Sequence, residues 1–351
     1  MDAALLSNRL FGIELPIIQA PMAGVQGSAL AAAVSAAGGL GSLPAAMLSA
    51  DAFRAEVEEI RRRTDRPFNV NFFCHTDPPF DAQRDEAWRD ALAPYYDELG
   101  VPRDAAAAGP ARAPFNADHA AVLEELRPAV VSFHFGLPDD ALLDRVRKTG
   151  AKILSSATTV AEARWLEERG VDAIIAQGAE AGGHRGMFLD EDVTTQLGTF
   201  ALLPQIMDAV RVPVIAAGGI ADARGVTAAF DLGASGVQIG TAYLLCPEAT
   251  TSAVHRAALR SDAAQHTTLT NVITGRPARG IVNRIIRELG PLRDDIPDFP
   301  LAAAAVQPLR SAAEARGSGD FSPLWAGENA FRCREVSAAE LTRELAAGVP
   351  R

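Results

Sequence analysis

The sequence of 351 residues is poor in cysteine and in aromatic residues. Its three cysteines, Cys74, Cys246 and Cys333, show no CxxC or CxxxC spacing, so the sequence indicates neither a disulfide framework nor a cysteine-based zinc site. No HExxH motif occurs, and acidic residues do not cluster at the ends of the expected strands. We therefore expect no bound metal and a reducing, cytoplasmic location.

Positive charge and long apolar runs are also scarce. Lysine and arginine number 33 against 44 acidic residues, a net charge of -11, so the chain as a whole presents no positive field to a nucleic-acid backbone. No stretch of about 18 uninterrupted apolar residues occurs, and the N-terminus lacks the basic flank and apolar core of a signal peptide. The sequence predicts a soluble protein that binds neither nucleic acid nor a membrane.

Three common catalytic or nucleotide-binding motifs are missing. There is no GxSxG segment, which argues against a serine hydrolase. There is no GxGxxG segment after an expected strand and no P-loop pattern. Dinucleotide binding in a Rossmann fold and nucleotide hydrolysis both lose their main support.

Eight short apolar runs recur along the chain, with amphipathic stretches between them. Most of these runs are apolar throughout, which is typical of parallel strands buried on both faces. The expected strands are PIIQAP (16–21), GLGSL (39–43), FNVNFF (68–73), VVSFHF (130–135), KILSS (152–156), AIIAQG (173–178), VPVIAAGG (212–219) and GVQIGT (236–241), and the expected helices are 27–37, 51–63, 138–148, 159–169, 198–210 and 222–232. The alternation predicts an α/β fold, a (β/α)8 TIM barrel, with a doubly wound open sheet as the alternative.

Two further segments depart from the βα rhythm. Residues 76–118 separate the third and fourth strands and contain the low-complexity run AAAAGPARAP (105–114), so we expect an inserted cap with a mobile tip. The barrel is expected over residues 1–246, followed by a smaller, helical, substrate-side segment at 247–310. Residues 311–351 are expected to form a C-terminal helical extension that packs on the barrel.

Glycine-rich turns follow the seventh and eighth expected strands. The segments AAGGIADARG (216–225) and QIGTAYL (238–244) place glycines where backbone N–H groups can approach a phosphate. A pair of such turns at the last two strands is typical of phosphate sites in TIM barrels. Alternatively, Gly218 and Gly219 merely form a tight turn.

Two histidines lie at the ends of expected strands. His184 stands in AQGAEAGGHRG (176–186), whose glycines let a flat ligand come close, and an imidazole there is suited to act as a general base. A surface position on a flexible loop is the alternative. His134 lies between Phe133 and Phe135 on the fourth strand, so alternation turns it to the opposite face, either toward the site or into the core.

Amide side chains recur at corresponding positions of different strands. They are Gln19, Asn69, Asn71, Gln177 and Gln238. Because an amide both donates and accepts hydrogen bonds, this set suits the edge of a heteroaromatic ring better than a metal ion. Glu180, in the same region, is either a ligand contact or a helix cap.

Six segments together resemble one known family. QAPMAGV, NVNFF, AQGAEAGGHRG, VPVIAAGGI, GASGVQIGT and TGRPARGIVN occur in this order between residues 10 and 285 and are similar to segments of the nitronate monooxygenases, once called 2-nitropropane dioxygenases. The resemblance implies an FMN-dependent (β/α)8 barrel that oxidises alkyl nitronates with dioxygen to a carbonyl compound and nitrite. Its partners would be a small nitronate or nitroalkane and dioxygen, with a monomer or a homodimer left open.

The resemblance also implies which residues form the site. The histidine of the family's AGGHxG motif corresponds to His184, the expected catalytic residue, and the flavin contacts carried over from the family are Met22, Asn71, Gln177, Gly182, Gly219, Gln238, Ile239, Gly240 and Thr241. From the strand-end positions we add Ala20, Pro21, Gly183 and Gly218 as expected flavin contacts and His134 as the second catalytic candidate. An imidazole at this place can remove an α-proton from a neutral nitroalkane or hold the anionic nitro group.

The sequence departs from the family in its expected substrate pocket. The segment WAGEN (325–329) carries Glu328 where the family often has an amide. Any tyrosine in the substrate pocket must be Tyr95, Tyr96 or Tyr243, because the chain has no others.

The functional interpretation leaves alternatives open. Arg276 and Arg279 of TGRPARG either attract an anionic substrate or pair with acidic groups. A flavin-dependent enoyl-acyl-carrier-protein reductase that uses a nicotinamide cofactor would share the GGH and AGGI segments. A flavin-binding barrel without catalysis is the third possibility.

Overall fold

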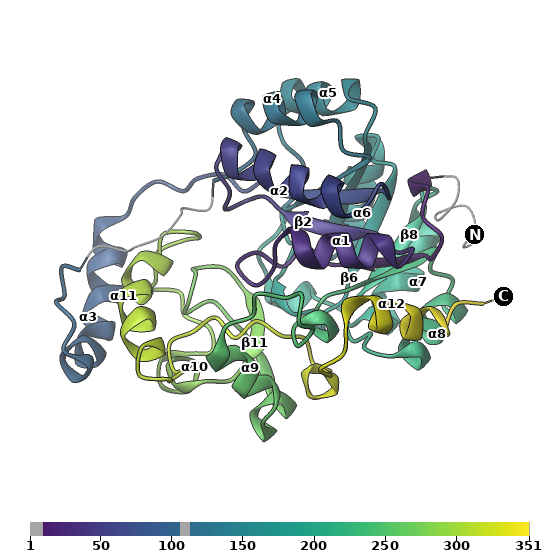
Figure 1. Cartoon of the computed structure of the whole chain (residues 1–351). Helices are drawn as coiled ribbons and strands as arrows, with labels where there is room; N and C mark the ends of the chain where they lie inside the picture. Colours follow the sequence, from purple (N-terminus) through teal and green to yellow (C-terminus); the bar gives the residue numbers. More distant parts are fainter. Residues whose placement is uncertain (1–9, 106–112, 351) are drawn as a thin grey trace.

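The chain folds around an eight-stranded parallel barrel (Figure 1). The computed structural model describes residues 10–105 and 113–350. The barrel strands are β1 (Ile17–Gln19), β2 (Gly41–Pro44), β3 (Phe68–Phe73), β4 (Val130–His134), β5 (Lys152–Ala157), β6 (Ala173–Gln177), β8 (Val214–Ala217) and β9 (Gly236–Ile239), in the order β1-β9-β8-β6-β5-β4-β3-β2. A parallel bridge between Ile18 and Leu40 joins the two edges. The predicted (β/α)8 barrel is therefore confirmed.

Helices surround the barrel on its outside (Figure 1). They are α1 (Ser28–Ala36), α2 (Ala50–Arg63), α4 (Ala117–Leu126), α5 (Asp140–Lys148), α6 (Val160–Glu168), α7 (Thr199–Ala209) and α8 (Ala223–Asp231). Several begin at a side chain that accepts a hydrogen bond from a backbone N–H of the first turn, as Ser49, Thr159 and Asp222 do for α2, α6 and α8.

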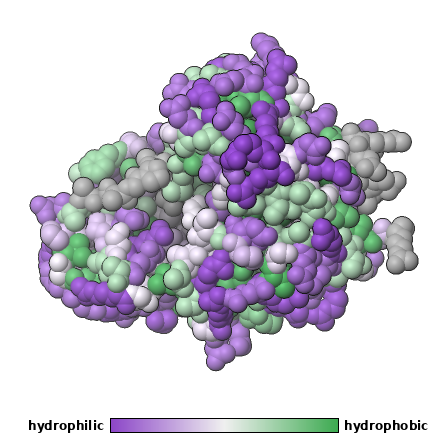
Figure 2. All heavy atoms as spheres, viewed as in Figure 1, coloured by the Kyte–Doolittle hydropathy of each residue, from purple (hydrophilic) through white to green (hydrophobic). Residues whose placement is uncertain are grey.

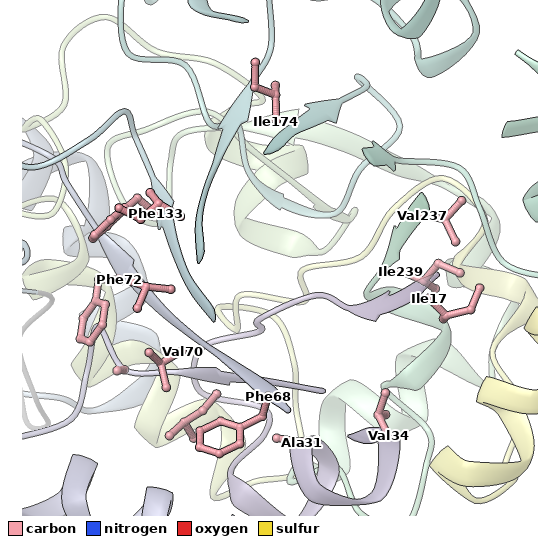
Figure 3. Close-up of a cluster of buried hydrophobic side chains, with 14 of the residues drawn as sticks. Ile17, Ala31, Val34, Phe68, Val70, Phe72, Phe133, Ile174, Val237 and Ile239 are labelled. Atoms are coloured by element: carbon pink, nitrogen blue, oxygen red, sulfur yellow. The ribbon is translucent and has the colours of Figure 1, made fainter. Parts of the chain in front are cut away.

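The side chains of the barrel strands alternate between two environments. On β3, Phe68, Val70 and Phe72 belong to the large core between strands and helices, which also holds Ile17 of β1 (Figure 3). Residues of the opposite face fill the barrel interior: Ile18, Val130, Leu154, Ala173, Ile175, Ile215 and Ala217. Apolar side chains on both faces explain why these strands read as continuous apolar runs.

The C-terminal helix α12 (Ala338–Ala346) completes the outer layer. It packs against α1, α8 and β1, and its Leu341 and Leu345 belong to the large core. The Thr342 hydroxyl lies 2.9 Å from the buried Tyr243 hydroxyl, which follows β9. A helix from the end of the chain thus covers the barrel where the helix after β9 would stand.

A smaller body lies beside the barrel, at the left of Figure 1. It includes α3 (Ala82–Leu99), α9 (Ala253–Leu259), α10 (Arg284–Leu289) and α11 (Ala303–Glu314). The inserted α3 packs on α11, and the Trp88 indole and the Tyr96 hydroxyl donate to the Ala302 and Ala305 carbonyls at 3.2 and 2.6 Å. The expected mobile tip at 105–114 falls mainly on residues 106–112, outside the described part of the chain.

The appended segment also contains strands that the sequence analysis did not predict. β10 (Thr267–Thr270) and β11 (Ala278–Ile281) pair antiparallel, and β11 pairs with β7 (Gly183–His184). TTLT and ARGI are short and lack apolar alternation, so no local pattern marks them. Helix α11 continues across residue 310, and the domain boundaries stay predictions.

The outer helices present mainly hydrophilic residues in the view of Figure 2, over α2, α4 and α5. Their apolar positions are turned inward, as with Phe53, Val57 and Ile60 of α2. Among the described residues, no helix is both long enough and apolar enough to cross a membrane.

Candidate active site

A cavity opens at the carboxyl ends of the barrel strands. Polar residues from the inward faces of five strands line it, namely Asn71, His134, Ser156, Gln177 and Gln238. The turns after β8 and β9, the loop that ends at β7 and residues of the appended segment complete the wall. All the expected flavin contacts and both candidate histidines lie in this one lining.

The glycine turns bring backbone close to the cavity. Gly218 and Gly219 have φ angles of +119° and +70°, which residues with a Cβ rarely adopt. A Cβ on Gly240 would lie 3.3 Å from the Ala20 Cβ and 3.4 Å from the Met22 sulfur. Gly218 and Gly219 therefore allow the tight turn after β8, and the lack of a side chain at Gly240 lets the backbone lie close to Ala20 and Met22.

His184 is held by contacts from distant parts of the chain. Its carbonyl accepts from Gln177 Nε2 at 3.0 Å, and Gln177 Oε1 accepts from the Gly186 N–H at 2.7 Å. Its ring nitrogen Nε2 lies 2.9 Å from the Thr274 hydroxyl oxygen. The ring packs edge-on against Phe299 and Trp325, with centroids 5.1 and 5.6 Å away. His184 is thus a positioned residue of the cavity and not a loose surface side chain.

His134 contacts the backbone of His184. His134 Nε2 lies 3.1 Å from the His184 carbonyl oxygen, and Nδ1 lies 3.2 Å from the Ser156 hydroxyl. Because a carbonyl only accepts, Nε2 carries the proton, and Nδ1 accepts from Ser156 in the neutral ring. The predicted alternation holds for Phe133, which packs in the outer core. It fails for Phe135, whose φ of +69° turns its ring beside His134.

Burial lowers the pKa of His134 to about 4. An unfolded histidine titrates near pH 6.5, so the unfolded chain binds more protons between these two values. The stability contributed by the neutral ring is present above pH 6.5 and is lost as the pH falls toward 4. We expect His134→Asn to flatten the dependence of unfolding free energy on pH in this window, by up to about 1.4 kcal/mol per pH unit.

Urea unfolding of both proteins at several values between pH 7 and pH 4.5 measures this slope. Identical slopes for the two proteins would show that His134 titrates alike in the folded and unfolded states.

Arg185 holds the loop that carries His184, a role that the sequence analysis missed. It is fully buried, and its guanidinium donates to the Gly178 and Gln177 carbonyls at 2.7 and 2.6 Å and to Gln196 Oε1 at 2.9 Å. Burial, followed by the charge of Arg279, lowers the pKa of Arg185 to about 10. The only feature of the local sequence that could have pointed to Arg185 is its position directly after His184, the expected catalytic residue.

Two of the expected amide contacts lie elsewhere. Gln19 bonds to Gln26, and Asn69 bonds to the hydroxyls of Ser42 and Ser132, so both amides brace strands outside the cavity lining. Glu180 lines the cavity and also accepts from the Thr199 N–H at the start of α7, so it acts as a cap.

The tyrosines do not reach the cavity. Tyr95 and Tyr96 pack in the core between α3 and α11, and Tyr243 is buried against Thr342. The rings packed around His184 are instead those of Phe73, Phe135, Phe299 and Trp325, of which Phe73 and Trp325 line the cavity. Phe299 comes from the segment 247–310, where no sequence pattern marked it as a site residue, whereas Trp325 begins the WAGEN segment that the sequence analysis had noted.

The two arginines of TGRPARG pair with acidic groups. Arg276 lies 3.5 Å from Glu191 and stacks on the Phe135 ring at 4.2 Å. Arg279 lies 3.2 Å from Glu328, the carboxylate that departs from the family pattern. Neither arginine is part of the cavity lining.

The lining fits a flavin in its chemistry. Gln238 Oε1 is buried without a hydrogen-bond partner among the described residues, so it is available to accept from a ring N–H. The turns at Gly219 and Gly240 supply close-lying backbone for a phosphate, beside the N-terminus of α8. Residues 10–105 and 113–350 contain no group of three or more metal-ligating side chains that could hold a metal ion.

Comparison with known proteins agrees with this geometry. The family model for nitronate monooxygenase matches residues 5–348. Nitronate monooxygenases of Pseudomonas aeruginosa and Paraburkholderia phytofirmans are 46% and 45% identical over 346 and 345 residues, which cover 96% of this chain and 97% and 92% of theirs. The crystal structure of nitroalkane oxidase from Streptomyces ansochromogenes matches with a TM-score of 0.88 and 40% identity, covering 97% of this chain and 96% of that one. The chain therefore belongs to the nitronate monooxygenase family and is an oxidoreductase.

Proposed function

We propose that this protein binds FMN and oxidises alkyl nitronates with dioxygen to a carbonyl compound and nitrite. The observation that carries the proposal is the shared cavity, which joins an imidazole at His184 to glycine turns after β8 and β9. The names of the related proteins support the same chemistry. Bound FMN would supply electron acceptance from the nitronate.

The residues of the chain would prepare the substrate. His184 would hold the anionic nitro group, or remove the α-proton when the substrate arrives as a neutral nitroalkane. The rings of Phe73, Phe299 and Trp325 pack around this imidazole, which is partly exposed. Asn71, Gln177, Gln238 and the glycine turns would hold the flavin.

His134 would act as a positioning residue. Both of its ring nitrogens are engaged, by the His184 carbonyl and by Ser156, so neither is available to take a proton from a substrate. Its bond to the His184 backbone, together with that from Gln177, fixes where the catalytic imidazole stands.

Thr274 would orient the His184 ring, because its hydroxyl oxygen lies 2.9 Å from Nε2. We expect Thr274→Val to lower kcat about tenfold and to shift the pH profile of kcat/KM, since a single oriented hydrogen bond is lost. Thr274→Ser should restore both. A pH profile of Thr274→Val that matches that of the parent protein would contradict this role.

Anaerobic mixing tests the function. The purified protein is mixed with a small alkyl nitronate, and its visible absorbance is recorded before and after air is admitted. Loss of flavin absorbance with the nitronate alone, followed by nitrite release in air, is the expected result. Reduction only by a reduced nicotinamide would replace the proposal with a reductase, and reduction by neither would indicate a barrel without this catalysis. A colourless purified protein would contradict the assignment of a bound flavin.

A further inference from the structure

Arg276 lies behind the part of the cavity wall that carries His184. It stands two residues before Ala278 of β11, and the register partner of Ala278 on β7 is His184. The Thr274 hydroxyl oxygen lies 2.9 Å from His184 Nε2 and 3.4 Å from the Arg276 carbonyl oxygen. The segment that holds Arg276 therefore runs directly beside the strand of His184.

The guanidinium of Arg276 packs on an aromatic ring that also contacts both histidines of the cavity. It lies 4.2 Å from the centroid of the Phe135 ring. The same ring centroid lies 4.5 Å from that of His134 and 6.0 Å from that of His184. The Arg276 side chain is only 13% exposed. A largely buried positive charge is thus held next to the two imidazoles without lining the cavity.

Two carboxylates near Arg276 cancel its charge only in part. Glu191 lies 3.5 Å away, but its side chain is 75% exposed, so water screens the pair. Glu162 is buried, but it accepts hydrogen bonds from the N–H groups of Thr158 and Phe188 and forms no ion pair with Arg276 in the described part of the chain. Arg276 therefore has no buried carboxylate in direct contact.

The charges that act on His134 are positive. Burial is the main cause of the lowered pKa of His134, and the positive charges of Arg276 and Arg185 lower it further. His134 lines the cavity, so the same charges act on a ligand beside it. The charged side chains of the lining itself are Glu180, Arg310 and Glu314. Because this lining carries more negative than positive charge, a preference for an anion has to come from the arginines behind the wall.

We propose that Arg276 makes the cavity selective for anionic substrates by placing a positive charge behind His134 and His184, without touching the ligand. This inference rests on the proposed function, because it concerns how the same cavity holds a nitronate. A single charge that acts through partly buried surroundings, beyond contact distance, changes the affinity for an anion about fivefold. Arg276 is then a specificity-determining residue and not a catalytic one.

Nitrate is the probe for the test, because it is a small planar anion whose binding requires no turnover. Its Kd for the FMN-containing protein is measured by calorimetric titration at constant ionic strength, with the FMN content of each variant recorded. We expect the Kd to rise about fivefold in Arg276→Gln, to stay within about twofold of the parent value in Arg276→Lys, and to fall about twofold in Glu191→Gln. A packing role of Arg276 would not make Glu191→Gln bind nitrate more tightly.

Arg145→Gln and Glu124→Gln are the matched controls. Arg145 of α5 and Glu124 of α4 form an ion pair at 2.7 Å outside the cavity lining. The same charge changes at these positions should leave the nitrate Kd unchanged. If Arg276→Gln does not fold, Glu191→Gln still carries the test, because Glu191 is exposed.

Four outcomes would overturn the inference: equal Kd values for Arg276→Gln and the parent protein, weaker nitrate binding by Glu191→Gln, no nitrate binding by the parent protein, or a loss in Arg276→Lys as large as that in Arg276→Gln. The last would assign the effect to packing. Charge-dependent nitrate binding by a protein that oxidises no nitronate would support the inference and reject the proposed function. Nitronate oxidation with a nitrate Kd that is insensitive to both charge changes would do the reverse.

Discussion

Replacing His184 with asparagine is expected to lower kcat about 10²- to 10⁴-fold while the flavin content stays unchanged. The range is that of a lost general acid or base. Asparagine is too short to keep the contact between Nε2 and Thr274, but the backbone bonds from His134 and Gln177 to residue 184 do not depend on the side chain. The variant therefore removes the imidazole and keeps the loop. Steady-state kinetics with a nitronate and with its neutral nitroalkane measure the effect.

The two substrates distinguish two roles of the imidazole. If His184 removes the α-proton, the loss is confined to the nitroalkane, and if it holds the nitro group, both substrates are affected. His266→Asn is the matched control, because His266 is exposed and lies outside the cavity lining. Full turnover of both substrates by His184→Asn would show that His184 takes no part in the reaction.

Gly41→Ala is expected to destabilise the protein by about 3 kcal/mol or more. Gly41 begins β2, directly beneath helix α1, and a Cβ there would lie 1.9 Å from the Ala31 carbonyl oxygen and 2.6 Å from its carbonyl carbon. These are backbone atoms, so no side-chain rotation relieves the overlap, and α1 must move away from the barrel. Chemical unfolding followed by circular dichroism gives the free energy.

Gly319→Ala is the matched control for this substitution. Its Cβ would meet side-chain carbons of Leu324 and Val254 no nearer than 3.5 Å, which is ordinary contact, and the backbone there is not left-handed. We expect a change within about 0.5 kcal/mol. Equal unfolding free energies for Gly41→Ala and the parent protein would show that α1 can shift on the barrel without cost.

The barrel could be predicted from local sequence because its strands are buried on both faces and most are therefore apolar throughout. In β6, Ile174 packs outward, Ile175 packs inward, and both are buried. A run that is apolar on both faces therefore identifies a barrel strand without knowledge of its neighbours. The strands β10 and β11 show no continuous apolar run, because they form a small sheet with β7 and include polar residues and glycine.

The residues at the strand ends were also foreseeable. Glycines after β8 and β9 and polar residues such as Asn71 and Gln238 occupy positions that the barrel topology brings to one rim. What local sequence could not give is the set of partners of each residue. The sequence left open whether a tyrosine reaches the substrate pocket, and packing places Tyr96 against α11 and Tyr243 against α12.

The sequence alone determined the barrel, the rim of motif residues and the family, because periodic burial and short motifs are properties of neighbouring residues. The tertiary structure alone decided what surrounds His184 and what lies beyond it. Thr274, Phe299 and His255 come from the segment 247–310 and Trp325 from the C-terminal extension, and both fold back over the strand ends. Their contacts depend on how two separately encoded bodies pack together, and no local pattern records that packing.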